Sequence, residues 1–303
     1  MKYQLSNYID EQEENTNAAK KELSEEPDRQ EHKAQLLEPI NPHKEEIKRI
    51  YAKYDRQKEF ISIAAHELKS PIVPILGALE LIEAEFEETG KEEITLKKEH
   101  FNLIVRNTKR LERVASDILD VTRIADQTLN LKKEYFNLNE IIVDAIIDFR
   151  EQIKKSNNSN NSNKLNLYHE FKNGQGENDT FFVYADKIRV TQIIYNLLSN
   201  AIKFTQEGMI SVSIFKQRKD ERDEVILSIR DTGTGIHPNI LPRLFSIFAT
   251  KSDTGMGLGL YISKNIVEAH GGSMWGVNNV DGKGATFSFS LPSSETYNYR
   301  KSR

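Results

Sequence analysis

The chain has 303 residues, a length that suggests about two domains, and it contains no cysteine, which excludes disulfides, thiolate catalysis and cysteine-bound metal sites. Its 42 basic and 46 acidic residues give a net charge of −4, so no basic excess indicates binding to nucleic acid. The longest stretch without a charged residue, Val190–Ile202, has 13 residues, fewer than the ~20 that a membrane helix needs, and the N-terminus lacks the apolar core of a signal peptide. We therefore expect a cytoplasmic protein with no direct membrane insertion.

The first segment, residues 1–42, is polar and its apolar residues recur at no steady period. This pattern predicts either a mobile tail or a loose helix that receives an input or docks a partner. The last residues, 294–303, are expected to form a second tail. Between the tails, the change of pattern predicts a helical domain over 43–128 and a mixed domain over 129–293.

Two apolar stripes, with members spaced alternately by four and three residues, predict two long helices in the helical domain. A polar break around Glu87–Lys98 separates them, so the helices should form an antiparallel hairpin. One hairpin cannot cover both stripes on all sides, and we expect two copies to pair as a four-helix bundle, which makes the protein a homodimer. The stripe residues are Ile61, Ala65, Leu68, Ile72, Ile75, Leu79, Ile82 and Phe86, then Phe101, Ile104, Thr108, Leu111, Ala115, Ile118, Thr122 and Ala125.

The second domain mixes short strand patterns with three predicted helices, Asn139–Lys154, Lys187–Phe204 and Leu258–His270. This mixture predicts an α+β two-layer sandwich, in which a mixed sheet is covered by helices on one face. Ser156–Asn163 is a polar low-complexity loop that we expect to be mobile. The predicted strands are Leu165–Lys172, Phe181–Tyr184, Met209–Phe215, Val225–Arg230, Ser273–Val277 and Ala285–Leu291.

The most informative residue of the first half is His66, which directly follows a stripe residue and can therefore face solvent beside the buried stripe. Glu67 can accept a hydrogen bond from one ring nitrogen and raise the nucleophilicity of the other. A lone histidine on a helix is more often a surface or packing residue, and Ser70 stands where a zinc-binding HExxH motif needs its second histidine. Pro71 and Pro74 remove helix hydrogen bonds, which predicts a bend, a strained turn or a tolerated kink beside His66.

Four further patterns follow in the second domain. Asn196 and Asn200 are one helical turn apart with Lys203 beyond them, a set that suits Mg²⁺ and phosphate oxygens, with ordinary surface amides as the alternative. DTGTGI follows a strand and points the Asp231 carboxylate into a pocket, although alone it is a common turn. TGMGLGL precedes a helix and resembles a loop that cradles phosphate, whereas GKGATF alone is a hairpin turn. The glycines that allow close approach are Gly233 and Gly235, then Gly255, Gly257 and Gly259.

In this order the motifs resemble those of the sensor histidine kinases of two-component signalling, over roughly Glu59–Leu291. The phospho-acceptor box reads FISIAAHELKSPI, the asparagine box QIIYNLLSNAIKFT, the phenylalanine box LFSIFAT, and the glycine boxes DTGTGI, GMGLGL and GKGATFSFSLP. The resemblance implies a dimeric phospho-acceptor hairpin followed by an ATP-binding domain of the gyrase and heat-shock-chaperone type. It implies ATP and Mg²⁺ as cofactors, and a response-regulator receiver domain as partner.

The resemblance also implies a role for each matching residue. His66 is the implied phosphorylated residue, and Glu67 its acid/base partner. Ser70 stands where the family more often has threonine or asparagine to position the water for dephosphorylating the partner, so phosphatase activity is left open. The implied nucleotide-site residues are Asp231 at the adenine amino group, Thr286 near the adenine, Gly233 and Gly235 in the adenine pocket, Asn196 and Asn200 at Mg²⁺, Lys203 and Lys251 at phosphate, and Gly255, Gly257 and Gly259 in the lid.

Asn196 separates this chain from the related gyrase-like and chaperone ATPases, which carry a glutamate at that position. An asparagine amide is no useful base for activating water, so transfer to a nucleophile of the protein is favoured over hydrolysis. We therefore predict that the chain phosphorylates its own His66 and passes the phosphoryl group to an aspartate of a separate receiver protein. A degenerate kinase that serves as a dimeric docking scaffold and a free-standing ATPase are the alternatives.

Overall fold

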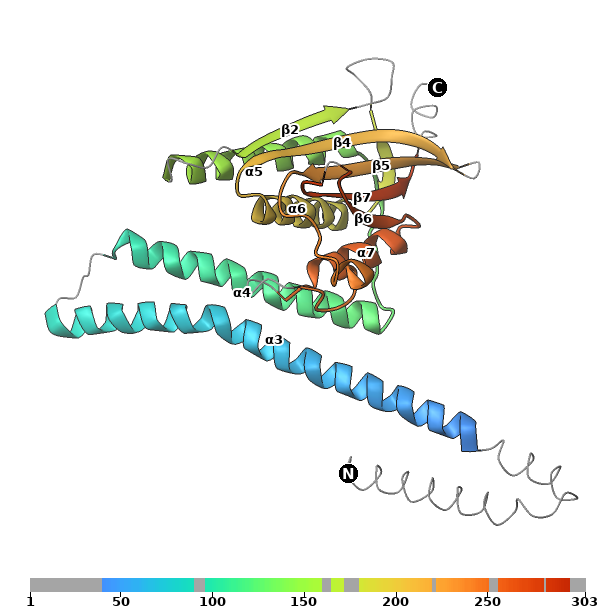
Figure 1. Cartoon of the computed structure of the whole chain (residues 1–303). Coiled ribbons are helices and arrows are strands. Elements are labelled where there is room, and N and C mark those ends of the chain that lie inside the picture. The colour runs from blue at the N-terminus through green and yellow to red at the C-terminus, as the bar shows by residue number, and fades with distance from the viewer. Residues whose placement is uncertain are drawn as a thin grey trace, which may run out of the picture. The chain divides into compact units, whose positions relative to one another are not determined.

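A computed structural model of the chain describes residues 40–89, 96–159, 165–171, 180–219, 222–250, 256–280 and 282–294 (Figure 1). Most of both predicted tails lies outside these residues. Contacts divide the chain into two compact units, Met1–Ile63 and Ala64–Arg303. Among the described helices, none combines the length and the apolar character that crossing a membrane requires.

A helical hairpin comes first in the chain, and strands and helices then alternate. The elements are α3 (Ile40–Thr89), α4 (Lys98–Ala125), β1 (Glu134–Asn137), α5 (Leu138–Ser159), β2 (Leu165–Phe171), β3 (Phe182–Ala185), α6 (Lys187–Phe204), β4 (Gly208–Lys219), β5 (Arg222–Asp231), the 3₁₀ turn η3 (Leu241–Arg243), α7 (Gly259–Ala269), β6 (Met274–Asn278) and β7 (Ala285–Pro292).

The hairpin formed by α3 and α4 is antiparallel, as predicted. Lys97, at the start of α4, lies 3.5 Å from the carboxylate of Glu85 near the end of α3. Arg110, in the middle of α4, donates to Glu67 in the middle of α3 at 3.3 Å. In an antiparallel hairpin the end of the first helix lies beside the start of the second, and the two helix centres lie side by side. Both pairs follow this arrangement.

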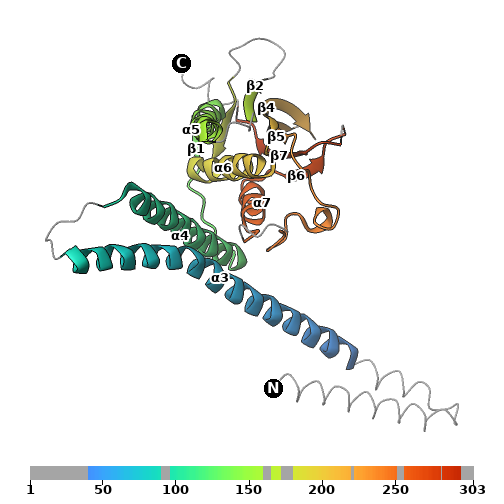
Figure 2. The same ribbon diagram turned by 60° about the vertical axis from the view of Figure 1, so that its left-hand side comes forward.

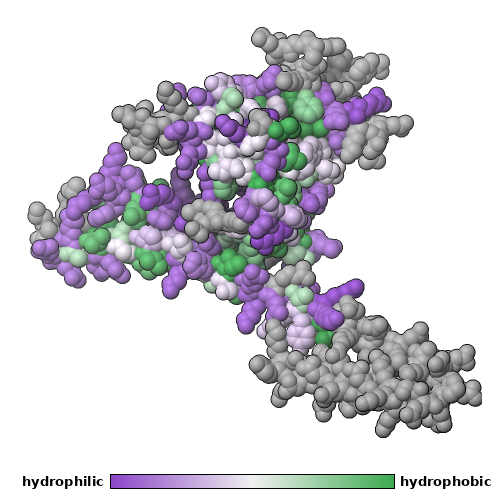
Figure 3. All heavy atoms as spheres, viewed as in Figure 1, coloured by the Kyte–Doolittle hydropathy of each residue, from purple (hydrophilic) through white to green (hydrophobic). Residues whose placement is uncertain are grey.

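The hairpin buries one line of small and apolar residues but leaves large apolar side chains exposed beside it. Ala64 and Ala78 of α3 and Val114 and Val121 of α4 are at most 8% exposed. Figure 3 shows apolar surface interrupting the hydrophilic surface along the hairpin. One copy of the hairpin therefore does not cover its own stripes. The exposed residues are Ile72, Val73, Leu76, Leu79, Leu81 and Phe86 of α3, with Phe101 and Leu119 of α4.

The second domain contains a five-stranded sheet in the order β2-β4-β5-β7-β6 and a two-stranded sheet of β1 and β3. β2 and β4 run parallel and the other pairs antiparallel, so the sheet is mixed. Helices α5, α6 and α7 lie on one face of it (Figures 1 and 2). The predicted fold class, a helical hairpin followed by an α+β sandwich with three main helices, is confirmed.

The core of the sandwich lies between the sheet and α6. Alternate residues of β4 such as Ile210 and Val212 are at most 1% exposed, because successive strand residues point to opposite faces. On α6, Ile193 and Leu197 recur at helical spacing and are equally buried. Each such side chain contributes about 1.5–3 kcal/mol of hydrophobic free energy. The apolar side of α6 is therefore packed against the sheet, and its polar residues lie on the opposite side of the helix.

Two local predictions were wrong in part, and one strand was missed. Pro71 and Pro74 lie inside α3, which continues through both as an α-helix, so the strained turn does not form and the alternative, prolines tolerated within the helix, is the one that fits. The predicted loop Ser156–Asn163 begins as helix, since α5 extends to Ser159; residues 160–163 lie outside the described part of the chain. Strand β1 was not predicted, because its four residues EYFN pair with one short strand only and show little alternation.

Candidate functional site

The predicted phospho-acceptor His66 lies on α3 with its side chain 81% exposed. Its Nδ1 atom is 3.7 Å from Oε1 of Glu67, whose side chain is only 13% exposed. Ser70 follows in the same helix, one turn after His66. The structure thus brings an exposed imidazole together with a carboxylate that can take the Nδ1 proton, and no described residue bonds Nε2.

The buried carboxylate of the second domain is that of Asp231, the last residue of β5, which is 4% exposed. Its Oδ1 atom accepts hydrogen bonds from the backbone N–H of Gly233 at 2.9 Å and of Ala285 at 3.3 Å. Burial raises the pKa of Asp231 above its ordinary value, while the two amides oppose this shift. No described residue bonds Oδ2, so this oxygen is available to a ligand that donates a hydrogen bond.

Two asparagines that sequence reasoning missed, Asn278 and Asn279, join the first and third glycine boxes. Asn278 both accepts from the backbone N–H of Ile236, at 2.6 Å, and donates to its carbonyl, at 2.9 Å. Asn279 donates to the carbonyl of Asp231 at 2.7 Å and accepts from the Thr286 hydroxyl at 2.7 Å. The sequence signal was a pair of amide residues at the end of a strand, directly before a glycine box.

The glycines around Asp231 are required by the packing of the chain on itself. Gly284 has φ +75°, and a Cβ there would lie 2.0 Å from the Asp231 carbonyl oxygen, so only glycine fits. At Gly233 a Cβ would lie 2.2 Å from the carbonyl oxygen of Phe204, and at Gly235 2.9 Å from the Asn278 side chain. This reason differs from the close approach of a ligand that the sequence suggested.

The polar side of α6 carries the three residues predicted from the asparagine box. Asn196 donates from Nδ2 to the buried Ser263 hydroxyl of α7 at 2.9 Å, which turns its Oδ1 toward Gly259, where a Cβ would lie 2.3 Å away. Asn200 lies one turn further, and its side chain has no hydrogen bond to a described residue. Partial burial lowers the pKa of Lys203 from its ordinary value. α6 therefore presents two amides and a lysine in series beside α7.

The second glycine box is only partly described. Lys251 and Gly255 lie outside the described residues, so the phosphate contact of Lys251 and the place of Gly255 in the lid stay predictions. Gly257 packs against the backbone of Phe248 and Ala249, and Gly259 is the first residue of α7. The glycine box thus meets the phenylalanine box directly before α7 begins.

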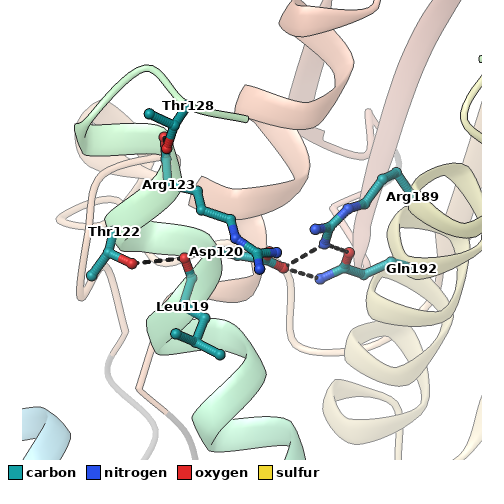
Figure 4. Close-up of polar contacts among 7 residues, drawn as sticks. All are labelled: Leu119, Asp120, Thr122, Arg123, Thr128, Arg189 and Gln192. Carbon is teal, nitrogen blue, oxygen red and sulfur yellow. Dashed lines mark hydrogen bonds and ion pairs between the residues drawn. The ribbon is translucent and has the colours of Figure 1, made fainter. Parts of the chain in front are cut away.

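A buried ion pair joins α4 to α6, the helix that contains the asparagine box (Figure 4). Asp120 is 2% exposed and accepts from Arg189 at 2.7 Å and from Gln192 at 2.9 Å. Arg123 lies 3.9 Å from the same carboxylate. Burial raises the pKa of the nearby Asp117 to about 6, and the negative charge of Asp120 adds to this shift. The sequence did not predict this contact, because its partners are 69 and 72 positions apart.

The geometry defines a class of protein: an exposed histidine on a helical hairpin, followed by an α+β domain with a buried carboxylate among glycine turns. Residues 56–127 match the His Kinase A (phospho-acceptor) domain, and residues 185–295 match the ATPases of the histidine kinase, DNA gyrase B and HSP90 type. Together the two matches cover more than half of the chain. The chain belongs to the sensor histidine kinases, as the sequence motifs predicted.

Several characterised proteins are similar over most of this chain. The sensor protein ChvG of Agrobacterium fabrum is 29% identical over 82% of the chain, and the sensor protein SrrB of Staphylococcus aureus is 33% identical over 79%. The chain spans only 41% and 38% of the lengths of these two proteins. A crystal structure of the histidine kinase ThkA with the response regulator TrrA aligns at a TM-score of 0.53 and 27% identity, over 84% of this chain and 67% of that one.

Proposed function

We propose that this chain is an ATP-dependent protein histidine kinase, which phosphorylates its own His66 and passes the phosphoryl group to an aspartate of a response-regulator receiver domain. The observation that carries the proposal is the exposed His66 imidazole, with Nδ1 at the Glu67 carboxylate and Nε2 unbonded, in a chain that also holds the Asp231 pocket. The family supports the same chemistry, and the histidine kinase ThkA, whose fold is similar, has a crystal structure in complex with a response regulator.

The residues around Asp231 fit the base of ATP. An adenine carries an amino group that donates hydrogen bonds, and Oδ2 of the buried carboxylate is an unused acceptor. Asn278 and Asn279 hold the surrounding turns from both sides, so the acceptor is fixed before a ligand arrives. Thr286 donates to Asn279, which in turn donates to the backbone carbonyl of Asp231, and this pair of bonds supports its proposed place near the adenine.

The residues of α6 fit Mg²⁺ and the phosphates. The Asn196 amide nitrogen donates to Ser263, which leaves the amide oxygen, a hard neutral ligand, for Mg²⁺. The Asn200 side chain has no hydrogen bond to a described residue. No cluster of three or more acidic or histidine ligands occurs among the described residues, so phosphate oxygens would complete the coordination. When bound, Mg²⁺ supplies neutralisation of phosphate charge. Lys203 adds a cation on the same helix.

The reaction forms one bond and breaks one at each step. The lone pair of His66 Nε2 attacks the γ-phosphorus, the bond from that phosphorus to the bridging oxygen breaks, and ADP leaves. Glu67 takes a share of the Nδ1 proton as positive charge develops on the ring. In the second step an aspartate oxygen of the receiver attacks phosphorus and the P–N bond breaks, which restores the neutral imidazole.

The wider assignments rest on the same proposal. The exposed apolar residues of the hairpin support pairing of two copies into a four-helix bundle. We propose domains at 43–128 and 129–293 between the tails 1–42 and 294–303, because α4 ends at Ala125 and the two family matches, 56–127 and 185–295, lie on either side of that end. A kinase that consumes ATP and serves a receiver domain works where both are supplied, so we propose a cytoplasmic location for these domains.

Incubation of the protein with γ-labelled ATP and Mg²⁺ is expected to give acid-labile label on the protein. His66→Gln should abolish the label, because it removes the proposed acceptor nitrogen, while His169→Gln, which removes an exposed histidine of β2, should keep it. Mass spectrometry of the wild-type peptide locates the phosphate. Label that survives in His66→Gln overturns the assignment. Rapid phosphate release without labelled protein indicates the ATPase alternative, and nucleotide binding without transfer indicates a scaffold.

Gly259→Ala is expected to lower the affinity for Mg-ATP about tenfold, the value of roughly one hydrogen bond to a charged group. The new Cβ would meet the Asn196 Oδ1 atom at 2.3 Å and displace the amide from its position. Gly77→Ala makes the same change inside α3, where no atom lies within 4 Å, and should leave affinity unchanged. Isothermal titration calorimetry compares the two variants, and equal affinities would refute the proposed role of Asn196.

A further inference from the structure

The two carboxylate oxygens of Glu67 lie near different partners, Arg110 and His66. Oε2 accepts a hydrogen bond from Nη2 of Arg110 at 3.3 Å, and Oε1 lies 3.7 Å from Nδ1 of His66. Arg110 is 43 residues away in the sequence and belongs to α4, the other helix of the hairpin. Glu67 is 13% exposed, against 81% for His66, so it is the enclosed member of the set.

Sequence adjacency alone does not direct Glu67 to His66. Neighbouring residues of a helix do not face each other, and a glutamate side chain has several rotamers in reach of solvent. A guanidinium that reaches across from a second helix selects one of these rotamers. Because Arg110 is itself 43% exposed, its pair with Glu67 contributes little to stability, and its effect lies in orientation.

We propose that Arg110 is a positioning residue for phosphoryl acceptance by His66. It holds Oε2 of Glu67 so that Oε1 faces Nδ1, which favours the tautomer with the proton on Nδ1 and the lone pair on Nε2. That lone pair forms the P–N bond while the bond to the bridging oxygen breaks, and the Nδ1 proton remains shared with Glu67. The inference deepens the proposed function and rests on it for the identity of the reaction.

The tautomer of His66 can be measured without nucleotide. Nitrogen-15 NMR of histidine-labelled protein resolves the ring nitrogens of seven histidines, and His66→Gln assigns the signal of interest. In the wild type we expect the Nδ1–H form to dominate, and in Arg110→Gln the tautomer ratio should fall at least twofold. Arg106→Gln, an exposed arginine one turn earlier on α4, is the matched control and should not change it. An unchanged ratio in Arg110→Gln overturns the proposal.

The rate of self-labelling gives a second readout. At saturating ATP, Arg110→Gln should slow labelling about tenfold, within the usual range for a misplaced proton acceptor, while the Kd for ATP stays the same. Arg110→Lys keeps the charge and should recover part of the rate, whereas a purely structural role would show as loss of helicity in both variants. A normal rate in folded Arg110→Gln overturns the inference. Wild-type protein that takes no label overturns the proposed function instead, and the tautomer ratio still reports on Arg110.

Discussion

Asp231→Asn is expected to lower the affinity for ATP about 100-fold. The asparagine oxygen can still accept the backbone N–H groups of Gly233 and Ala285, so the fold should persist. Its amide nitrogen, however, replaces the acceptor Oδ2 with a donor, which in the proposed site faces the amino group of adenine, itself a donor. Loss of a hydrogen bond to a charged group costs about 1.5–3 kcal/mol, and tenfold in affinity corresponds to about 1.4 kcal/mol.

Calorimetric titration of ATP into the purified variant measures this loss, and thermal unfolding shows that the domain stays folded. Asp223→Asn, which changes an exposed aspartate of the same strand, is the matched control and should bind ATP like the wild type. An Asp231→Asn variant with wild-type affinity would remove Asp231 from the nucleotide site.

Arg189→Met is expected to weaken the contact between α4 and α6 by about 3 kcal/mol, the lower end of the cost of leaving a buried carboxylate without its cation. Asp120 is 2% exposed and would keep only Gln192 and the more distant Arg123. Hydrogen exchange of the last turns of α4 and the first turns of α6 should accelerate, and chemical denaturation measures the free energy.

Two further variants separate the ion pair from its surroundings. Arg123→Met removes a cation that is 52% exposed and 3.9 Å away, so it should cost about 1 kcal/mol or less. Asp120→Leu combined with Arg189→Met replaces both charges by apolar groups and should recover much of the loss. If Arg189→Met leaves exchange and stability unchanged, the pair does not hold the two helices together.

The sequence predicted best those elements that are long enough to show the hydrophobic periodicity of a helix or a strand within their own residues. The asparagine-box helix has the predicted bounds Lys187–Phe204, because a continuous apolar side packs on the sheet and Asp186 caps its first turn. The five strands of the large sheet lie within a few residues of the predicted ranges. The missed strand β1 has four residues, and its extended form depends on β3, some fifty positions later.

The candidate site shows the same division. His66, Asp231 and the glycines stand in contiguous motifs, so their types and spacing were visible in the sequence. Arg110 and Asn279 act on residues 43 and 48 positions away, and only the folded chain brings them together. Their side chains donate hydrogen bonds to a side chain or a backbone carbonyl far away in the sequence, and such long-range contacts produce no recognisable motif around the donor residue.

Helix α6 contacts α4 at its first turns and carries the last residues of the asparagine box at its other end. Its 18 residues extend about 27 Å at 1.5 Å per residue, with Arg189 and Gln192 in the opening turns and Asn200 and Lys203 in the closing ones. On the proposed function, a tilt of α6 at its Asn200–Lys203 end also moves Arg189 and strains its pair with Asp120 of α4. The proposed function therefore predicts that nucleotide binding and the packing of α4 on α6 are coupled.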